Sequence, residues 1–308
     1  MHSRATNIYN LRISGKIMQE LDQAASELKT FNPLLERLNK LPGTTIRLPS
    51  KGLFYVNGEL DAECKDGEIQ LSPMTTTDEL MMRSTDMLFQ GTAIDNVLKR
   101  CSPQIKKPLE LFVADIDYIL TQLRKISYGS HIPINYECDC VTDEAEKKKM
   151  KEAGDTEYLI PIENLIQHTK ELDPKNFNKQ FNVKLTNGQH VILQPLRFID
   201  FIKIQQMEDP SLLKDIENVK EYVAANFTSV TKSVDEITDK EMIKEWYKAL
   251  PRLDAERIKN KLNKMDSWGI EFKHSITCRK CKKEKEITSH LNPVYFFMLP
   301  SSPETNSD

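Results

Sequence analysis

The chain has 308 residues, of which 39% are hydrophobic and 29% are charged, and its formal net charge is −3. This length allows two modest domains or one domain with a large insertion. The near balance of charges argues against a protein that mainly coats nucleic acid, and the absence of an apolar run of about 18 residues argues against a membrane span. The start of the chain, MHSRATNIYNLRISGK, lacks the apolar core of a signal peptide, so we expect a cytoplasmic address.

Residues 11–40 show the apolar spacing of amphipathic helices, with a break at Asn32-Pro33 and a stop at Pro42-Gly43. Lys, Glu, Gln and Asp lie between the apolar positions, which is typical of a helix with one solvated face. We predict a helical arm over residues 1–43. Two interpretations stay open, because an amphipathic stripe alone does not name its partner: the arm packs on its own domain, or it docks on another protein.

Residues 44–130 combine strand and helix signals. Short strand-like runs occur near 45–48, 53–56 and 68–71, separated by turn residues at 50–52 and 57–58. A threonine-rich run at 75–79 predicts a helix start, and helices are expected over 92–100 and 109–127. Asp115 and Asp117 flank the apolar face of the last helix. Positions two apart on a helix point in different directions, so we expect solvated or capping carboxylates, not an acid–base pair.

The second half alternates between strand and helix patterns. Residues 131–138 and 157–162 read as strands around a charged stretch, 143–157, that is either an exposed loop or a short solvated helix. Asn187-Gly188 predicts a tight hairpin between runs at 181–185 and 190–196, because both residues tolerate positive φ. A helical block follows over about 198–266, and residues 270–277 are strand-like. The tail, 301–308, is polar and predicted to be disordered.

Four of the six cysteines form two close pairs, Cys138-Asp139-Cys140 and Cys278-x-x-Cys281. Zinc in structural sites takes four such ligands in a tetrahedron. Each pair ends a strand-like run and is followed by a polar turn and another strand-like run, which indicates two hairpins that share one zinc ion, as in a zinc ribbon. Cys138 and Cys140 are too far apart on a fully extended strand, so this pair must bend.

Several alternatives to a four-cysteine zinc site remain. His131, His274 or His290 lies close enough in sequence to replace one cysteine, and the cysteines could also be unligated thiols or form one disulfide pair. A redox role for the CxxC is disfavoured, because no apolar helix pattern follows it. The cations around it are expected to offset the negative charge of a zinc ion held by four thiolates; they are Arg279, Lys280, Lys282, Lys283 and Lys285.

These signals together predict an α+β protein with a helical arm and several further segments. A small β/helical domain covers 44–130, and a zinc-ribbon-like β unit has its halves at 131–180 and 270–300. A hairpin-plus-helices insertion over 181–269 separates those halves. The sequence lacks G-x-S-x-G, HExxH and phosphate-loop motifs, and a zinc ion with four protein ligands has no open position for catalysis. We therefore expect no enzyme, no small-molecule substrate and no catalytic residues.

Three stretches of the chain resemble the T4-type bacteriophage baseplate family, which includes the baseplate hub proteins and hub assembly factors of contractile-tailed phages. They are LPSKGLFY (48–55), IQLSPMTTTDEL (69–80) and GTAIDNVLKRC (91–101). The resemblance covers about 45–130, and the cysteine-bearing hairpins extend it over 131–300. It does not cover the arm at 1–40.

The resemblance implies a role in assembling the baseplate hub through protein–protein contacts with other baseplate proteins. The implied location is the virion tail baseplate, the host cytoplasm during assembly, or both. The stretch best suited to a partner surface is Lys51 to Tyr55, where exposed aromatic residues on a turn would bind well, although buried aromatic residues are the commoner case. The alternative function is a zinc-ribbon protein that binds nucleic acid or regulates another process. The basic patch at 279–285 is small, which argues against nucleic acid as the partner.

Overall fold

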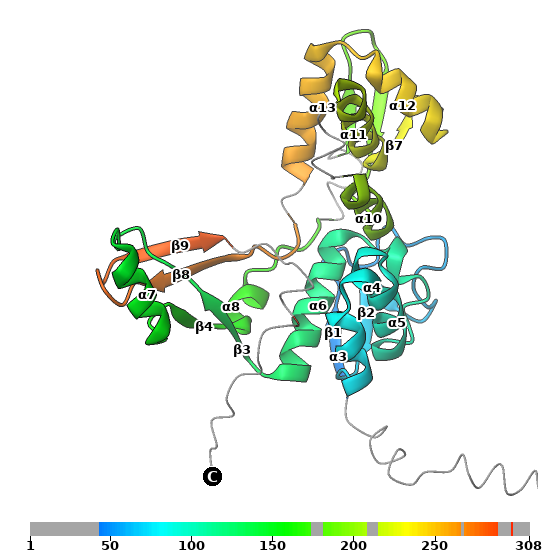
Figure 1. Ribbon diagram of the computed structural model, residues 1–308. Helices are drawn as coiled ribbons and strands as arrows, with labels where there is room; N and C mark the ends of the chain where they lie inside the picture. The colour runs from blue at the N-terminus through cyan, green and yellow to red at the C-terminus, as the bar shows by residue number, and fades with distance from the viewer. Residues whose placement is uncertain (1–42, 174–180, 208–214, 266–267, 289–296, 298–308) are drawn as a thin grey trace, which may run out of the picture. The chain divides into compact units, whose positions relative to one another are not determined.

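The computed structural model describes residues 43–173, 181–207, 215–265, 268–288 and 297. The chain divides into two compact units, 1–42 and 43–308, and all described residues belong to the second unit. The predicted arm, up to residue 42, and the predicted tail at 301–308 lie outside the described residues. Within the described part, ten α-helices accompany four small antiparallel sheets, which confirms the predicted α+β class (Figure 1).

The first sheet is built from two short strands, β1 (Thr44–Arg47) and β2 (Glu68–Leu71). Ile46 lies opposite Ile69, and both are buried because alternate side chains of a strand face the same side. Four helices enclose the same core: α3 (Thr76–Arg83), α4 (Thr85–Phe89), α5 (Thr92–Cys101) and α6 (Val113–Tyr128). Two short 3-10 turns, η1 (Lys65–Gly67) and η2 (Pro108–Glu110), connect these elements.

The PMTTTDEL stretch is the N-terminal cap of α3. The Thr75 side chain accepts a hydrogen bond from the backbone N–H of Asp78, and the Asp78 carboxylate accepts one from the N–H of Thr75. This reciprocal arrangement is a capping box. The buried Asp78 also pairs with Arg100 at 2.5 Å, and Arg100 donates to the carbonyl of Pro73 at 2.8 Å. The start of α3 is thereby fixed to the end of α5, which joins two of the stretches that carry the family resemblance.

The LPSKGLFY stretch is a series of turns, and the prediction of a strand at 53–56 is wrong. Lys51 and Gly52 have φ values of 56° and 69°, which bend the backbone away from an extended course. The N–H of Leu53 bonds to the carbonyl of Ser50, and the N–H of Tyr55 to that of Gly52. A Cβ on the neighbouring Gly67 would lie 2.8 Å from the backbone of this turn, so only glycine permits the close approach.

Asp115 is fully buried, so the prediction of a solvated or capping carboxylate is wrong for this residue. Its oxygens accept hydrogen bonds from the N–H of Ser50 at 3.0 Å and from the hydroxyl of Tyr55 at 2.5 Å. The Tyr55 oxygen in turn accepts one from the N–H of Phe112 at 2.9 Å. Burial raises the pKa of Asp115 to about 6, and burial raises the pKa of the half-buried Asp117 to about 7. The carboxylate is therefore the internal acceptor that holds the LPSKGLFY turn on α6.

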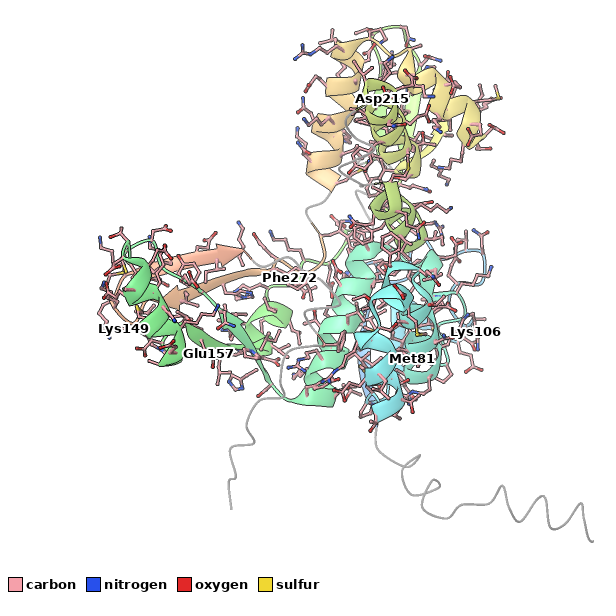
Figure 2. The ribbon with its side chains drawn as sticks, viewed as in Figure 1. Met81, Lys106, Lys149, Glu157, Asp215 and Phe272 are labelled. Atoms are coloured by element: carbon pink, nitrogen blue, oxygen red, sulfur yellow. The ribbon has the colours of Figure 1, made fainter. Side chains whose placement is uncertain are left out.

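A second core forms around a three-stranded sheet of order β5 (Asn182–Lys184), β6 (His190–Leu193) and β7 (Thr231–Val234). The hairpin predicted at Asn187-Gly188 is confirmed, with Gly188 at φ 87°. Helices α11 (Ile216–Ser229), α12 (Lys240–Lys248) and α13 (Arg252–Met265) accompany this sheet, and α10 (Phe198–Met207) precedes them. The side chain of Asp215, labelled in Figure 2, caps the first turn of α11. The strand β7 lies where the sequence pattern did not predict one.

Two further hairpins carry the cysteine pairs. One pairs β3 (His131–Asn135) with β4 (Glu157–Pro161), and the other pairs β8 (Lys273–Thr277) with β9 (Glu284–Thr288). The charged stretch after β3 contains a helix, α7 (Glu144–Glu152), capped by Asp143, and α8 (Ile162–Gln167) follows β4. Phe272, just before β8, packs against the first core (Figure 2). None of the described helices is long and apolar enough to cross a membrane.

Candidate metal centre

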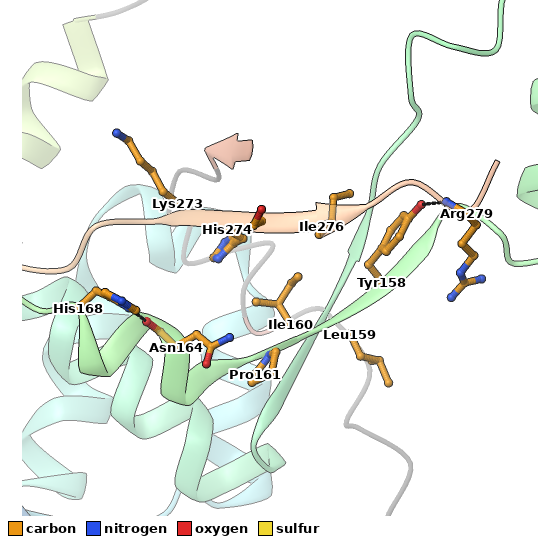
Figure 3. A pocket seen from close by; sticks show the side chains of 11 residues that line it. Tyr158, Leu159, Ile160, Pro161, Asn164, His168, Lys273, His274, Ile276 and Arg279 are labelled. Carbon is orange, nitrogen blue, oxygen red and sulfur yellow. Dashed lines mark hydrogen bonds between the residues drawn. The ribbon is translucent and has the colours of Figure 1, made fainter. Parts of the chain in front are cut away.

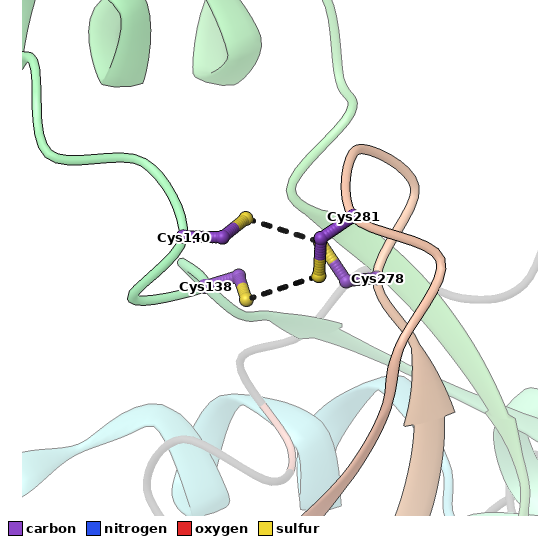
Figure 4. Close-up of side chains that lie close together, drawn as sticks. All are labelled: Cys138, Cys140, Cys278 and Cys281. Atoms are coloured by element: carbon purple, nitrogen blue, oxygen red, sulfur yellow. Dashed lines mark hydrogen bonds between the residues drawn. The ribbon is translucent and has the colours of Figure 1, made fainter.

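The structure brings Cys138, Cys140, Cys278 and Cys281 together, and their sulfur atoms all lie within 4.8 Å of one another (Figure 4). Two of the distances that join the two pairs are 3.7 Å, between the Sγ atoms of Cys140 and Cys278, and 4.0 Å, between those of Cys138 and Cys281. A tetrahedral zinc ion with bonds of about 2.3 Å requires sulfur–sulfur distances of about 3.8 Å. We call these residues the four-cysteine cluster.

The CxxC pair lies in the tight turn between β8 and β9. The N–H of Cys278 bonds to the carbonyl of Lys283 at 3.0 Å, and the N–H of Lys282 bonds to the carbonyl of Cys278 at 2.9 Å. Lys282 completes the turn with a φ of 61°. Backbone N–H groups of Cys281 and Lys280 point at the Cys278 sulfur and lower the pKa of that thiol to about 6. The turn therefore presents one sulfur as a thiolate before any ion is considered.

The CxC pair bends out of the strand direction after β3, as its predicted ligand role requires. The N–H of Val141 bonds to the carbonyl of Cys138 at 3.0 Å, which turns the chain between the two sulfurs. Desolvation and the neighbouring thiols raise the pKa of Cys140 to about 12. Four thiolates at this spacing repel one another, so a doubly charged cation is needed to hold all four deprotonated. A donor set of four sulfurs and no oxygen fits zinc in chemistry and spacing.

Protein contacts also join the two hairpins beside the cluster. The guanidinium of Arg279 donates to the carbonyls of Gly154 and Glu157 at 2.8 and 2.7 Å and lies over the ring of Tyr158. Lys280 pairs with Glu146 on α7 at 2.7 Å. Arg279 and Lys280 thus bind the first hairpin, a role that sequence reasoning missed when it assigned them to charge balance. The sequence signal for this role is weak: the stretch 143–157 has a small excess of acidic residues, and the stretch 279–285 is basic.

The histidines suggested as alternative ligands lie elsewhere or outside the described residues. His274 lines a hollow of about 430 Å³ between β4 and β8, together with His168 (Figure 3). The Nδ1 atom of His131 is 3.0 Å from the Ser130 hydroxyl. Within the described ranges, the group of side chains placed to hold a metal contains the four cysteines and no histidine. His290 falls outside the described residues.

At the predicted partner surface, Lys51 to Tyr55, the rings of Phe54 and Tyr55 are half-buried, so the prediction of exposed aromatic residues is wrong there. The ring of Phe54 packs edge-on against Phe112 at 5.0 Å, and the ring of Tyr55 stacks on Phe112 at 5.3 Å. Lys51 pairs with Glu171 at 2.6 Å, and only Leu53 is exposed, at 40%. The hydrogen bond from Tyr55 to Asp115 explains the difference, because it requires the ring to point inward.

The fold and the site define a class of protein: an α+β protein in which two cysteine-bearing hairpins meet at one cluster. A family model described as T4 bacteriophage base plate protein matches residues 56–298, most of the chain. The chain belongs to this family, so its role lies in the structure or the assembly of a phage tail baseplate. The match includes all four cysteines and begins directly after LPSKGLFY. Comparisons with curated proteins and with solved structures gave no match.

Proposed function

We propose that this protein is a non-enzymatic component or assembly factor of the baseplate hub of a contractile-tailed phage, acting through contacts with other baseplate proteins. The observation that carries the proposal is the family match over residues 56–298. The buried links between Asp78 and Arg100, and between Asp115 and the LPSKGLFY turn, agree with it. They give the residues that carry the resemblance a structural task.

We further propose that the four-cysteine cluster holds one structural zinc ion in a zinc-ribbon-like unit. When bound, zinc would supply a fixed tetrahedral link between two chain segments and no open position for a substrate. The turn at Cys278 positions two of the sulfur atoms, and the bend at Cys138 positions the other two. Arg279 joins the second hairpin to the first through its hydrogen bonds to Gly154 and Glu157. Such a unit orders the chain without chemistry of its own, in agreement with a structural role.

The test of the hub role is recovery of partners from infected cells. An affinity-tagged copy, expressed during infection, should co-purify with other tail baseplate proteins that mass spectrometry identifies. An equally tagged, unrelated cytoplasmic protein is the control for background. Recovery of nucleic acid alone would contradict the hub role and favour the zinc-ribbon nucleic-acid protein. Purified virions, analysed by immunoblotting, should then separate a virion component from a factor that acts only during assembly in the host cytoplasm.

A further inference from the structure

A hollow of about 470 Å³ opens between the loop after the LPSKGLFY turn and the three-stranded sheet. Its floor is aromatic: the ring of Phe54 contacts the rings of Phe112 and Phe181 at centroid distances of 5.0 and 5.7 Å. We call it the Phe54 hollow, and its lining includes Phe54, Val56, Phe112, Phe181, Ile192 and Lys232. This volume suits one or two large side chains of another molecule.

Two apolar side chains at this hollow are exposed to solvent. Val56 is 81% exposed and Ile192 is 38% exposed. Ile192 faces outward because its neighbours on β6, Val191 and Leu193, are buried in the second core, and alternate strand residues face opposite sides. Exposed apolar residues beside an aromatic floor are a typical setting for an anchor residue of a partner protein.

The charge at the hollow is positive and is concentrated on one side chain. The guanidinium of Arg197 is already paired with Glu59 and Glu110, each at 3.1 Å. Lys232 makes no ion pair with any residue that the structure describes, and its side chain is exposed. It is the extra residue of a β-bulge, since Ile192 lies opposite Ser233 while Leu193 lies opposite Thr231. A bulge redirects a side chain, and here it places an amine beside the apolar hollow.

We propose that the Phe54 hollow binds a partner protein segment in which one large apolar side chain stands next to an aspartate or glutamate. The apolar side chain would fill the hollow over Phe54, and the carboxylate would pair with Lys232. This inference rests on the proposed baseplate role, which supplies the class of partner, and adds the chemistry of the segment that is recognised. Single-stranded nucleic acid fits less well, because the rings pack edge to face, at 82° and 64°, so the edge of one ring lies against the face of the other and they form no flat platform for stacking bases.

The test uses full-length protein loaded with zinc and a random library of displayed 12-residue peptides as the probe. We expect enrichment of peptides that carry Trp, Phe, Leu or Ile next to Asp or Glu. For one enriched synthetic peptide, Ile192→Asp and Lys232→Glu should each weaken binding about tenfold, measured by fluorescence polarisation. Lys232→Glu should also reverse the dependence of Kd on salt, because salt weakens the ion pair of the parent but screens the repulsion between the new glutamate and the peptide carboxylate.

Two surface changes on α13 serve as matched controls. Leu253→Asp removes a side chain that is 61% exposed, and Lys259→Glu reverses an exposed cation. Both should change the Kd less than about twofold. Absence of enrichment, enrichment without acidic residues, or equal effects in the control variants would overturn the inference. Competition of the peptide by an oligothymidine would also overturn it, in favour of a nucleic-acid groove.

Failure of this inference can be told apart from failure of the hub role. If Ile192→Asp and the parent protein recover the same tail proteins from infected cells, and no peptide binds the hollow, the inference fails and the hub role stands. If the hollow binds acidic apolar peptides while infected cells yield no tail protein, the hub role fails instead.

Discussion

Asp115 shows what a single buried carboxylate does in this protein. It accepts hydrogen bonds from the N–H of Ser50 and the hydroxyl of Tyr55, residues more than fifty positions earlier in the chain. Burial removes the water that would stabilise the charged carboxylate, so it raises the pKa of Asp115 to about 6. Fixing a turn through this group therefore makes the stability of the fold depend on pH.

The replacement Asp115→Asn tests this dependence. Because the folded-state pKa is raised, the contribution of Asp115 is fully present below the unfolded value of 3.8 and is lost as pH rises through about 6. The free energy of unfolding of the parent, relative to Asp115→Asn, should thus fall by about 2 kcal/mol between pH 4 and pH 7. Urea titrations across this range measure it. A difference that does not change with pH would contradict the assignment.

A second carboxylate gives a control with a different pH window. Burial raises the pKa of Asp117 to about 7, and no hydrogen bond comparable to those of Asp115 accompanies it in the described contacts. The parent, relative to Asp117→Asn, should continue to lose stability up to about pH 7, beyond the window of Asp115.

Helix α3 is the element in which a sequence signal and a structural contact agree most closely. Thr75 forms a capping box with Asp78, and Asp78 also holds Arg100 of α5. The cap therefore does two tasks: it satisfies free N–H groups of the first turn, and it positions the carboxylate that joins two helices.

The replacement Thr75→Ala should lower the free energy of unfolding by about 1 kcal/mol, because an N-cap oxygen is lost. Thr77→Ala is the matched control, since Thr77 is an exposed helical threonine two residues further on. It should be neutral or slightly stabilising, because alanine has the higher helix propensity. Chemical denaturation at neutral pH measures both changes, and equal losses would show that the cap is not responsible.

At the hairpins, the replacement Cys278→Ser tests whether metal binding orders a separate part of the chain. Loss of one thiolate should abolish tight zinc binding and raise hydrogen exchange over 131–168 and 270–288 far more than over 45–130, because metal binding is coupled to local folding. Cys64→Ser removes a thiol outside the cluster and should leave exchange in the hairpins unchanged. Uniform loss of protection throughout the chain after Cys278→Ser would contradict a separately ordered unit.

For the whole molecule, the four-cysteine cluster predicts a simple stoichiometry. Purified protein should contain about one zinc ion per chain by elemental analysis. Removal of the metal with a strong chelator should lower the Tm, and zinc should restore it, because an ion that binds only the folded state adds stability. Protein that is folded, metal-free and unaffected by added zinc would rule out the cluster as a zinc site.

Much of the fold followed from local signals. The Asn187-Gly188 hairpin, the cap at Thr75 and the pairing of the two cysteine motifs each depend on residues close in sequence or on a known ligand spacing. The contacts that remained hidden join distant segments: Asp115 with Ser50, and Arg279 with Gly154. The sequence is the same whether a charged side chain is solvated or bonds to a distant backbone group, so the sequence pattern could not predict these contacts.

The spacing of the four-cysteine cluster has a consequence for the time course of synthesis. Cys140 and Cys281 are 141 positions apart. At roughly 5–20 residues per second, a ribosome needs on the order of ten seconds to travel between them. During this interval Cys138 and Cys140 lack the other two cysteines of the cluster, while the residues of the three-stranded sheet and its helices are synthesised. The cluster can therefore close only after Cys281 has been synthesised, so a chain cut short before Cys281 could not complete it.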